Sequence, residues 1–324
     1  MDVLVVNAGS TSLKLDLVSP DETSRRIDSY AEVGGDVGAV GHRIVHGGAR
    51  FKAPVVIDEA VEREVADLAL IAPLHNTPAL QALEEARRAL PDVPHVAVFD
   101  TAFHASIPDE AAVYAVPSRW REEWGVRRFG FHGLSVQWSA ERVRAPRLVV
   151  CHLGGGCSVT AVLDGRSVDT SMGFTPLEGV PMAARSGSVD PGALLFLLRE
   201  RFLTLDELDH ALEHESGLKA LGGLESPLGL GVYTHRIAAA VAGMASALGG
   251  LDALVFTAGV GENVSAVRAE VCRRLGFLGI ELDAAANESV TPDTDISAAG
   301  SRVRVAVVRA REEVVVARAV RALS

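Results

Sequence analysis

Residues 3–18 read VLVVNAGSTSLKLDLV, which has the pattern of a strand, a tight polar loop and a second strand. From Leu13 to Leu17 the leucines alternate with polar residues, the two-residue period of a half-buried β-strand. Residues 148–163, LVVCHLGGGCSVTAVL, repeat this pattern with a glycine-rich loop in the same place. The repetition predicts two structurally similar halves.

The rest of the chain alternates strands with helices, which predicts an α/β fold. Asp164 and Gly165 have the residue types of a hairpin turn after the second strand–loop–strand pattern. Thr77 and Pro78 have the residue types of a helix cap and a first helical position. We expect further strands at 95–100 and 303–308, and helices at about 58–71, 78–90, 191–202, 205–214, 233–248 and 312–323.

The composition is that of a globular protein with a sizeable core: 324 residues, 48% hydrophobic and 23% charged, which suggests two domains. The 31 basic and 42 acidic residues give a net charge of −11, which argues against a nucleic-acid binder or a polybasic membrane binder. We expect neither a signal peptide nor a membrane span, because every apolar run is too short. Three cysteines without disulfide or zinc spacing favour a cytoplasmic protein with buried thiols.

Three loops that follow hydrophobic strands have residues suited to phosphate oxygens. Residues 7–14 combine asparagine, hydroxyls and one lysine, whereas 154–156 are three glycines whose amides can approach an anion closely. Residues 259–263 place glycines at a helix start, where the helix dipole favours an anion. Ordinary turns use the same residue types, but three such loops together favour a phosphate site. There is no Walker A loop and no complete Rossmann fingerprint.

Two arginines are candidate ligands for an anion. Arg43 and Arg185 lie in glycine-flanked, otherwise apolar loops, and the guanidinium fork binds carboxylate or phosphate bidentately. For Arg127 and Arg128 an ordinary structural or surface role is the simpler interpretation. Asp100 ends a buried strand, where a carboxylate needs a partner unless it caps a helix.

Together these segments resemble the acetate kinase family, which includes acetate and propionate kinases. The resemblance covers nearly the whole chain, in the family's order. Its motifs are NAGSTSLK (7–14), GHRIVHGG (41–48), PLHN (73–76), FDTAFH (99–104), RFGFHG (128–133), CHLGGG (151–156), MGFTPLEG (172–179) with RSG (185–187), and FTAGVGEN (256–263).

The resemblance implies two ribonuclease H-like halves, as in the sugar-kinase, heat-shock-protein and actin superfamily, with a nucleotide cleft between them. It implies an N-terminal domain of residues 1–102, completed by a C-terminal helix at about 312–324, and a nucleotide-binding domain of residues 103–311. It also implies a homodimer and a reversible, Mg²⁺-dependent transfer of the ATP γ-phosphate to acetate, which gives acetyl phosphate and ADP. A carboxylate is already an anion at pH 7, so cations rather than a strong base would be needed.

The family's functional residues map onto this sequence by motif. Arg43 and Arg185 would hold the carboxylate and the transferring phosphoryl group, and His132 would donate to that group. Asp100 would position the acceptor or act with the metal. Other implied substrate or metal ligands are His75, Asn7 and Glu312, the last chosen over Glu313. The implied nucleotide or phosphate ligands are Ser10, Ser12, Lys14, His152, Gly154, Gly155, Gly156, Gly259, Gly261, Glu262 and Asn263.

Three departures from the family leave the donor and the acyl group open. Only 27 residues separate Lys14 from His42, fewer than in the family. Gly155 stands where the family has asparagine, and the Asp-x-Arg pair that follows the equivalent of Gly217 is missing. The alternatives are a propionate or butyrate kinase, a variant that uses pyrophosphate, and a nucleotide-binding protein without catalysis. Propionate and butyrate stay open as acceptors because one methylene is worth only about 1–3 kcal/mol in an apolar pocket.

Overall fold

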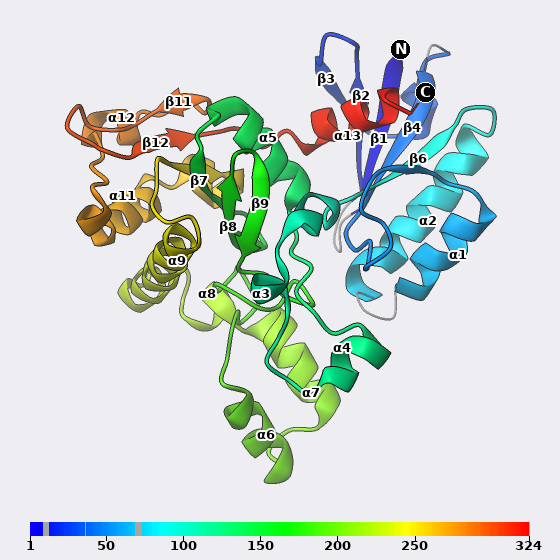
Figure 1. Ribbon diagram of the computed structural model, residues 1–324. Coiled ribbons are helices and arrows are strands. Elements are labelled where there is room, and N and C mark those ends of the chain that lie inside the picture. The colour runs from blue at the N-terminus through cyan, green and yellow to red at the C-terminus, as the bar shows by residue number, and fades with distance from the viewer. Residues whose placement is uncertain (9–12, 36, 69–72, 324) are drawn as a thin grey trace. The chain divides into compact units, whose positions relative to one another are not determined.

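The computed structural model describes residues 1–8, 13–35, 37–68 and 73–323 (Figure 1). The chain forms two compact units. Unit 1 contains Met1–Ala105, Phe131–Trp138 and Arg311–Ser324, and unit 2 contains Ser106–Gly130 and Ser139–Ala310. Each unit is built around a six-stranded mixed sheet with helices, so the predicted α/β class is confirmed.

The sheet of unit 1 has the strand order β3-β2-β1-β4-β6-β5. Its strands β1, β4 and β6 are parallel, whereas β2, β3 and β5 run antiparallel to their neighbours. The strands are β1 (Asp2–Ala8), β2 (Leu13–Val18), β3 (Ser24–Ile27), β4 (Val37–Ile44), β5 (Val55–Val56) and β6 (His95–Phe99).

The sheet of unit 2 has the same topology, with the order β9-β8-β7-β10-β12-β11. Its strands are β7 (Arg147–Leu153), β8 (Cys157–Leu163), β9 (Arg166–Thr170), β10 (Ala253–Thr257), β11 (Thr294–Asp295) and β12 (Arg304–Val307). In register, Asn7 lies opposite Arg43 and His152 lies opposite Thr257. Asp164 and Gly165 have φ of 47° and 80°, as a tight hairpin turn requires. The two similar halves predicted from the repeated pattern are therefore confirmed.

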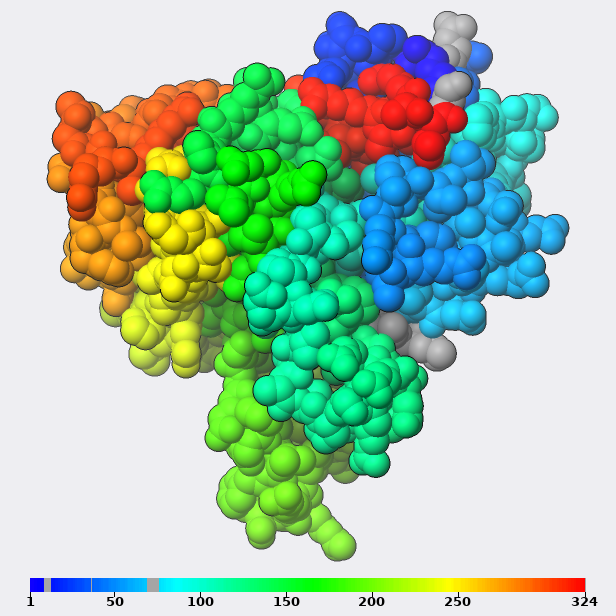
Figure 2. All heavy atoms as spheres, in the orientation of Figure 1, coloured from blue at the N-terminus to red at the C-terminus, as the bar shows by residue number. Residues whose placement is uncertain are grey.

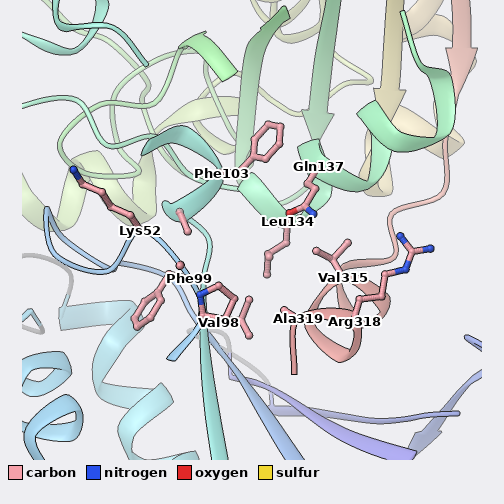
Figure 3. Close-up of a pocket in the computed structure, with 12 residues that line it drawn as sticks. Lys52, Val98, Phe99, Phe103, Leu134, Gln137, Val315, Arg318 and Ala319 are labelled. Carbon is pink, nitrogen blue, oxygen red and sulfur yellow. The ribbon is translucent and has the colours of Figure 1, made fainter. Parts of the chain in front are cut away.

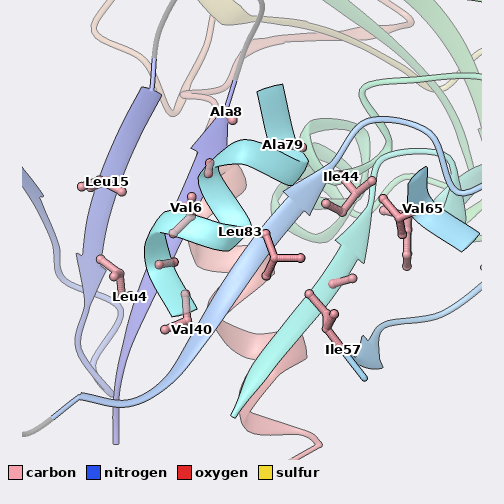
Figure 4. Close-up of a cluster of buried hydrophobic side chains, with 14 of the residues drawn as sticks. Leu4, Val6, Ala8, Leu15, Val40, Ile44, Ile57, Val65, Ala79 and Leu83 are labelled. Atoms are coloured by element: carbon pink, nitrogen blue, oxygen red, sulfur yellow. The ribbon is translucent and has the colours of Figure 1, made fainter. Parts of the chain in front are cut away.

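In unit 1, helices cover both faces of the sheet. Helix α2 (Pro73–Ala89) packs on β1 and β4 and lies beside α1 (Glu59–Leu68). Leu83 of α2 points into a core that includes Val6, Val40 and Ile44 (Figure 4). Helix α13 (Glu312–Arg321) packs on the same strands as well. Gly41 permits this approach, because a Cβ there would lie 2.6 Å from the Val316 side chain.

Two helices of unit 2 begin where the sequence predicts, at Pro191 and Leu205, but the predicted start at 233 is wrong, because Ser226 caps that helix and Pro227 takes its first position. Asp190 caps α6, and Thr204 with Glu207 forms a capping box at α7. The helices are α3 (Asp109–Ala112), α4 (Ser118–Trp124), α6 (Pro191–Arg199), α7 (Leu205–His210), α8 (Gly217–Ala220), α9 (Pro227–Ala247), α10 (Ala258–Asn263), α11 (Ser265–Arg274) and α12 (Ala284–Glu288). Helix α5 (Gly133–Val143) starts in unit 1 and ends in unit 2. No helix within the described residues is long and apolar enough to span a membrane.

The predicted start of the helix at Thr77 and Pro78 is wrong. Helix α2 begins at Pro73 and contains Pro78 inside it. A proline there forgoes one hydrogen bond of the helix, but a tertiary contact fixes this first turn. Asn76 accepts from the His46 N–H at 3.2 Å and donates to the His46 carbonyl at 3.1 Å. This pairing outweighs the local signal of the proline.

A buried histidine pair in unit 1 is held in its neutral form. His95 Nε2 donates to the Leu90 carbonyl at 3.0 Å, so His95 Nδ1 accepts from His42 Nε2 at 2.9 Å. The remaining His42 nitrogen, Nδ1, has no hydrogen-bond partner among the described residues. Burial, together with the neighbouring His95 and Arg87, lowers the pKa of His42 to about 3.

We therefore expect acid to destabilise the protein through His42. The unfolded chain binds this proton below pH 6.5 and the folded chain does so only near pH 3, so stability is lost as the pH falls between these values. Between pH 7.5 and pH 5, His42→Gln should lose about 2 kcal/mol less stability than the wild type, measured by urea unfolding. The exposed His235→Gln is the control. Equal losses in wild type and His42→Gln would contradict this assignment.

Candidate functional site

Arg43 is the centre of a charged cluster at the carboxyl end of the unit 1 sheet. Its guanidinium donates to both carboxylate oxygens of Asp100, with Nε lying 3.1 Å from Oδ1. Nη1 donates to Asn7 Oδ1 at 3.0 Å, and Nε lies 3.4 Å from Glu312 Oε2. Because β1, β4 and β6 are parallel, they bring Asn7, Arg43 and Asp100 to one edge. The dipole at the start of α13 favours Glu312 there.

The cluster is largely shielded from water and has an excess of negative charge. The Asp100 side chain is 0% exposed, Arg43 14% and Glu312 17%. One guanidinium and two carboxylates sum to −1. Burial by itself would lower the pKa of Arg43, but the charges of Asp100 and Glu312 outweigh burial and raise it above its ordinary value. Arg43 is therefore a fixed cation, and the cluster as a whole favours an additional cation.

Between the two candidate metal ligands at the start of α13, the structure brings Glu312 into the cluster. Glu313 instead lies 3.4 Å from Arg311, and burial raises its pKa, with the nearby Asp16 adding to the shift. Asn7 and Glu312 supply oxygen atoms, which Mg²⁺ prefers, and the net charge of the cluster fits a cation. Across the described residues, no three His, Cys, Asp or Glu side chains gather closely enough to form a metal site on their own.

His132 lies on a strained turn beside Asp100. It has a φ of 60°, which is unusual for a residue with a side chain. The next residue, Gly133, donates its N–H to the Asp100 carbonyl at 3.1 Å, and a Cβ at Gly133 would lie only 2.1 Å from that oxygen. The preceding Phe131 carbonyl lies 2.9 Å from His104 Nε2. The turn thus requires glycine at position 133 and holds the backbone of His132 against Asp100.

The structure describes only some of the other predicted residues of unit 1. Lys14 is exposed on β2, opposite Asn7. Ser10 and Ser12 lie outside the described residues. His75 belongs to α2, but its side chain is not among those that the structure describes.

Unit 1 also contains a cavity of about 390 Å³ (Figure 3). Its walls are mainly apolar and include Phe99, Leu134 and Val315, with Lys52, Gln137 and Arg318 as polar members. Arg318 already forms an ion pair with Glu22, at 2.6 Å. The cavity is lined by neighbours of the predicted residues in sequence but by none of the predicted residues themselves.

In unit 2 the triple-glycine loop lies beside two other predicted segments. The Gly155 carbonyl accepts from the Ala183 N–H at 3.2 Å, next to the segment that contains Arg185. A Cβ at Gly154 would lie 3.5 Å from the Ala258 side chain, at the start of α10. A Cβ at the exposed Gly155 would meet no atom within 4 Å, so the backbone does not require glycine at that position.

The predicted third loop forms the short helix α10, which is fixed from both ends. Glu262 Oε1 accepts from the N–H of Ala258 at 3.0 Å and from the N–H of Ala310 at 2.9 Å. Arg268 Nη1 donates to the carbonyls of Gly261 and Glu262, each at 3.0 Å. Glu262 thus shapes the loop with its own carboxylate. Gly259 and Asn263 are exposed and can face a ligand.

Sequence reasoning missed Arg268, which is 1% exposed. Its guanidinium is also held by Asn287, through Nε to Oδ1 at 2.7 Å and Nη2 to the backbone carbonyl at 2.8 Å. Nothing local in the sequence distinguishes this arginine from the exposed Arg273 and the half-buried Arg274 of the same helix. Its burial depends on where α12 packs, which is a tertiary property.

Arg128 has a structural role, in line with the simpler interpretation. Its Nη1 donates to the carbonyls of three consecutive residues, 170–172, at 2.9–3.1 Å. Its Nη2 donates to Glu178 at 3.0 Å, and Glu178 also accepts from the Tyr114 hydroxyl. These bonds fix the loop of residues 173–179. Farther along the chain, Arg185 Nε lies 3.0 Å from Glu213 Oε2.

Several known proteins are similar to this chain. Residues 25–318 match the model of the Acetokinase family, a match that begins after the first loop. An acetate kinase from Nostoc punctiforme is 45% identical over 317 residues, which cover 90% of this chain and 77% of that protein. Another, from Gloeobacter violaceus, is 46% identical over 308 residues, covering 87% and 76%.

Solved structures of similar proteins have the same fold. A propionate kinase from Francisella tularensis superposes with a TM-score of 0.90 at 30% identity, over 98% of both chains. An acetate kinase from Porphyromonas gingivalis superposes with a TM-score of 0.86 at 31% identity, over 100% of both chains.

Proposed function

Because this chain belongs to the acetokinase family, we propose that it transfers the γ-phosphoryl group of ATP reversibly to the carboxylate of acetate. The observation that carries the proposal is the buried arrangement of Arg43, Asp100, Asn7 and Glu312 at one sheet edge. A protein that only bound a nucleotide would have no use for a fixed cation of this kind. The products are acetyl phosphate and ADP.

The residues of unit 1 would receive the acceptor and the metal. Arg43 neutralises charge on the substrate, and Asp100 holds the Arg43 guanidinium in one orientation. The acceptor carboxylate is already ionised near pH 7, so no group has to remove a proton from it. His132 would donate to the transferring phosphoryl group. Asn7 and Glu312 would hold Mg²⁺, which when bound offsets the charge of the phosphate oxygens.

The residues of unit 2 would bind the nucleotide and its phosphates. Gly154, Gly155 and Gly156 offer backbone amides to phosphate oxygens, with His152 at the end of the strand before them. Helix α10 would contribute Gly259, Gly261 and Asn263, with Glu262 fixing its shape. Arg185 would contact the phosphoryl group as charge spreads over its oxygens. That unit 2 is the nucleotide-binding domain, and that the protein is cytoplasmic, are parts of this proposal.

Trapping the acyl phosphate as its hydroxamate tests the proposal. Acetate, propionate and butyrate are each supplied with ATP or with pyrophosphate, plus Mg²⁺. We expect turnover with acetate and ATP. Activity with pyrophosphate but not with ATP would mean that the protein forms acyl phosphate from a different phosphoryl donor. The missing Asp-x-Arg pair is the reason to include pyrophosphate in the test. Folded protein that binds ATP yet forms no acyl phosphate with any acceptor would overturn the enzyme assignment.

We further propose that the protein is a homodimer, paired through the region of α6. Helix α6 has no buried residue, and Figure 2 shows the chain around it as a protrusion of unit 2. Phe196 is 54% exposed and Phe202 64% exposed, with their rings in contact at a centroid distance of 5.7 Å. Apolar side chains gathered in this way on a surface favour association.

Phe196→Glu combined with Phe202→Glu should therefore convert the dimer to a monomer. In a symmetric dimer each patch contacts the same patch of the partner subunit, so the two glutamates of one subunit would face the two of the other. Burying these unpaired charges costs free energy and disfavours the dimer. The molar mass in solution, from light scattering after size-exclusion chromatography, is the measurement. Phe277→Glu is the matched control, because Phe277 is 69% exposed on another part of unit 2. A dimer that survives the double substitution would place the interface elsewhere.

A further inference from the structure

Arg185, the proposed phosphoryl ligand of unit 2, is paired with a carboxylate that the sequence did not single out. Its Nε lies 3.0 Å from Glu213 Oε2, and the two side chains are 18% and 13% exposed. Arg185 Nη1 also lies 3.4 Å from the Pro176 carbonyl. Thus a group expected to bind a substrate anion already has an anion of the protein beside it.

Glu213 is held in this position by an unusual local structure. It lies in a π-helical turn, Ala211–Glu215, which follows α7. Such turns are rare and often occur at functional sites. The turn is joined to the segment of Arg185 by two backbone hydrogen bonds, from the Ser186 N–H to the Leu212 carbonyl at 3.0 Å and from the Ser216 N–H to the Ala184 carbonyl at 2.9 Å.

A glycine two positions beyond this turn tightens the same contact. Gly217 has a φ of 63°, and a Cβ there would lie 2.5 Å from the Arg185 carbonyl and 2.2 Å from that of Met182. A residue with a side chain would therefore push the two segments apart. The contact between Glu213 and Arg185 follows from this close packing of two backbones, not from a chance meeting of long side chains.

The pairing is close, yet it is not a hydrogen bond. Glu213 Oε2 is buried and has no hydrogen-bond partner within the part of the chain that the structure describes. The attraction is therefore electrostatic, without the alignment that a hydrogen bond adds. An incoming anion that offers aligned acceptors to the Arg185 guanidinium can replace this pairing without breaking a hydrogen bond to Glu213.

We propose that Glu213 is an internal counter-anion of Arg185, which sets the affinity of the site for anionic substrate. The inference rests on the proposed function of Arg185. While the site is empty, Glu213 offsets the buried charge of Arg185 and holds it near its working position. When an anion binds, the Glu213 charge repels it, so affinity is kept below what Arg185 alone would give. Because Glu213 repels the bound anion in the ground state and in the transition state alike, its charge raises KM and leaves kcat unchanged.

Removing this charge should tighten anion binding. In Glu213→Gln we expect the Kd of inorganic phosphate, measured by calorimetry at constant ionic strength, to fall on the order of tenfold. The KM for acetate should fall in parallel, with kcat within about twofold of the wild type, since uniform binding alters KM alone. Glu215→Gln is the matched control, because Glu215 lies on the same turn but is 60% exposed and pairs with His210 at 3.5 Å.

A double-mutant cycle assigns the effect to Arg185. The gain from Glu213→Gln should disappear in an Arg185→Ala background, since the two side chains act as a pair. A gain that persists there would indicate a general field effect and would overturn the proposal. An unchanged or weaker phosphate Kd in Glu213→Gln would overturn it too, because Glu213 would then only position Arg185.

A second variant keeps the test decisive. If Glu213→Gln does not fold, Glu213→Asp keeps the charge but withdraws it by one methylene, and the phosphate Kd should fall about twofold to threefold. An aspartate variant that binds no more tightly than the wild type would also contradict the proposal. Because phosphate binding is measured without turnover, this test gives an answer even if the wild type makes no acyl phosphate.

Discussion

Arg43→Ala is expected to lower acyl-phosphate formation by about a thousandfold or more and to destabilise unit 1 by about 3–5 kcal/mol. The loss of activity follows from removing the cation that would neutralise substrate and transition-state charge. The loss of stability has a separate cause. Asp100 is fully buried, and Arg43→Ala removes the guanidinium that contacts both of its carboxylate oxygens, so a buried negative charge loses this cation. Hydroxamate trapping measures the first effect, and urea unfolding measures the second.

Two comparisons separate these effects. Arg50 also forms a close ion pair, with Glu64 at 2.7 Å, but its side chain is 74% exposed. Arg50→Ala should therefore cost about 0–1 kcal/mol and leave turnover unchanged. Adding Asp100→Ala to Arg43→Ala should restore part of the stability, because the buried charge is gone, without restoring activity. Wild-type turnover in Arg43→Ala would remove Arg43 from the proposed site.

Arg185→Ala is expected to lower kcat/KM by about a thousandfold, while the Kd for ATP changes by less than about threefold. Arginines that contact a transferring phosphoryl group contribute mainly in the transition state, where charge on its oxygens is redistributed. Under the proposed function, nucleotide affinity would depend instead on the backbone of residues 154–156 and on α10. Initial rates and calorimetric titration with ATP give the two quantities.

The matched control for this arginine is Arg304→Ala. Arg304 also belongs to unit 2 and pairs with Asp295 at 2.8 Å, but the two side chains are 48% and 46% exposed. Its removal should alter neither quantity. If Arg185→Ala abolished ATP binding, and the loss of ATP affinity accounted for the whole loss of rate, Arg185 would be a nucleotide ligand. If turnover were untouched, the reading of this chain as a kinase that uses Arg185 would fail.

Much of the fold could be predicted because it depends on local pattern. The repeated strand–loop–strand pattern predicted two similar halves, and the two sheets have the same strand order. The caps at Asp190 and Thr204 were recognised from residues in contact along the chain. The helix start predicted at Pro78 is wrong for the opposite reason, since Asn76 anchors that helix to His46, thirty residues away. A local rule gave the wrong helix start there because a distant contact carried more free energy.

The candidate site divides in the same way. Motifs alone identified Asn7, Arg43 and Asp100, and the structure brings these three together. The motif favours Glu312 over Glu313 as the metal ligand, and the packing of α13 adds the neighbours of each carboxylate, Arg43 for Glu312 and Arg311 for Glu313. Glu213 and Arg268 had no signal in the sequence. Each becomes informative only through a partner that the fold supplies, Arg185 in one case and the end of α10 in the other.

The α/β class, the internal repetition, the family and the residue types available for chemistry all follow from the amino-acid sequence, because periodicity, turn residues and motifs are properties of neighbouring positions. Which charges are buried, which carboxylate pairs with which arginine and which histidines stay neutral became known from the packed structure. Those outcomes depend on the desolvation of a group and on the distance to its partners. Both quantities arise only when strands and helices far apart in the chain pack together.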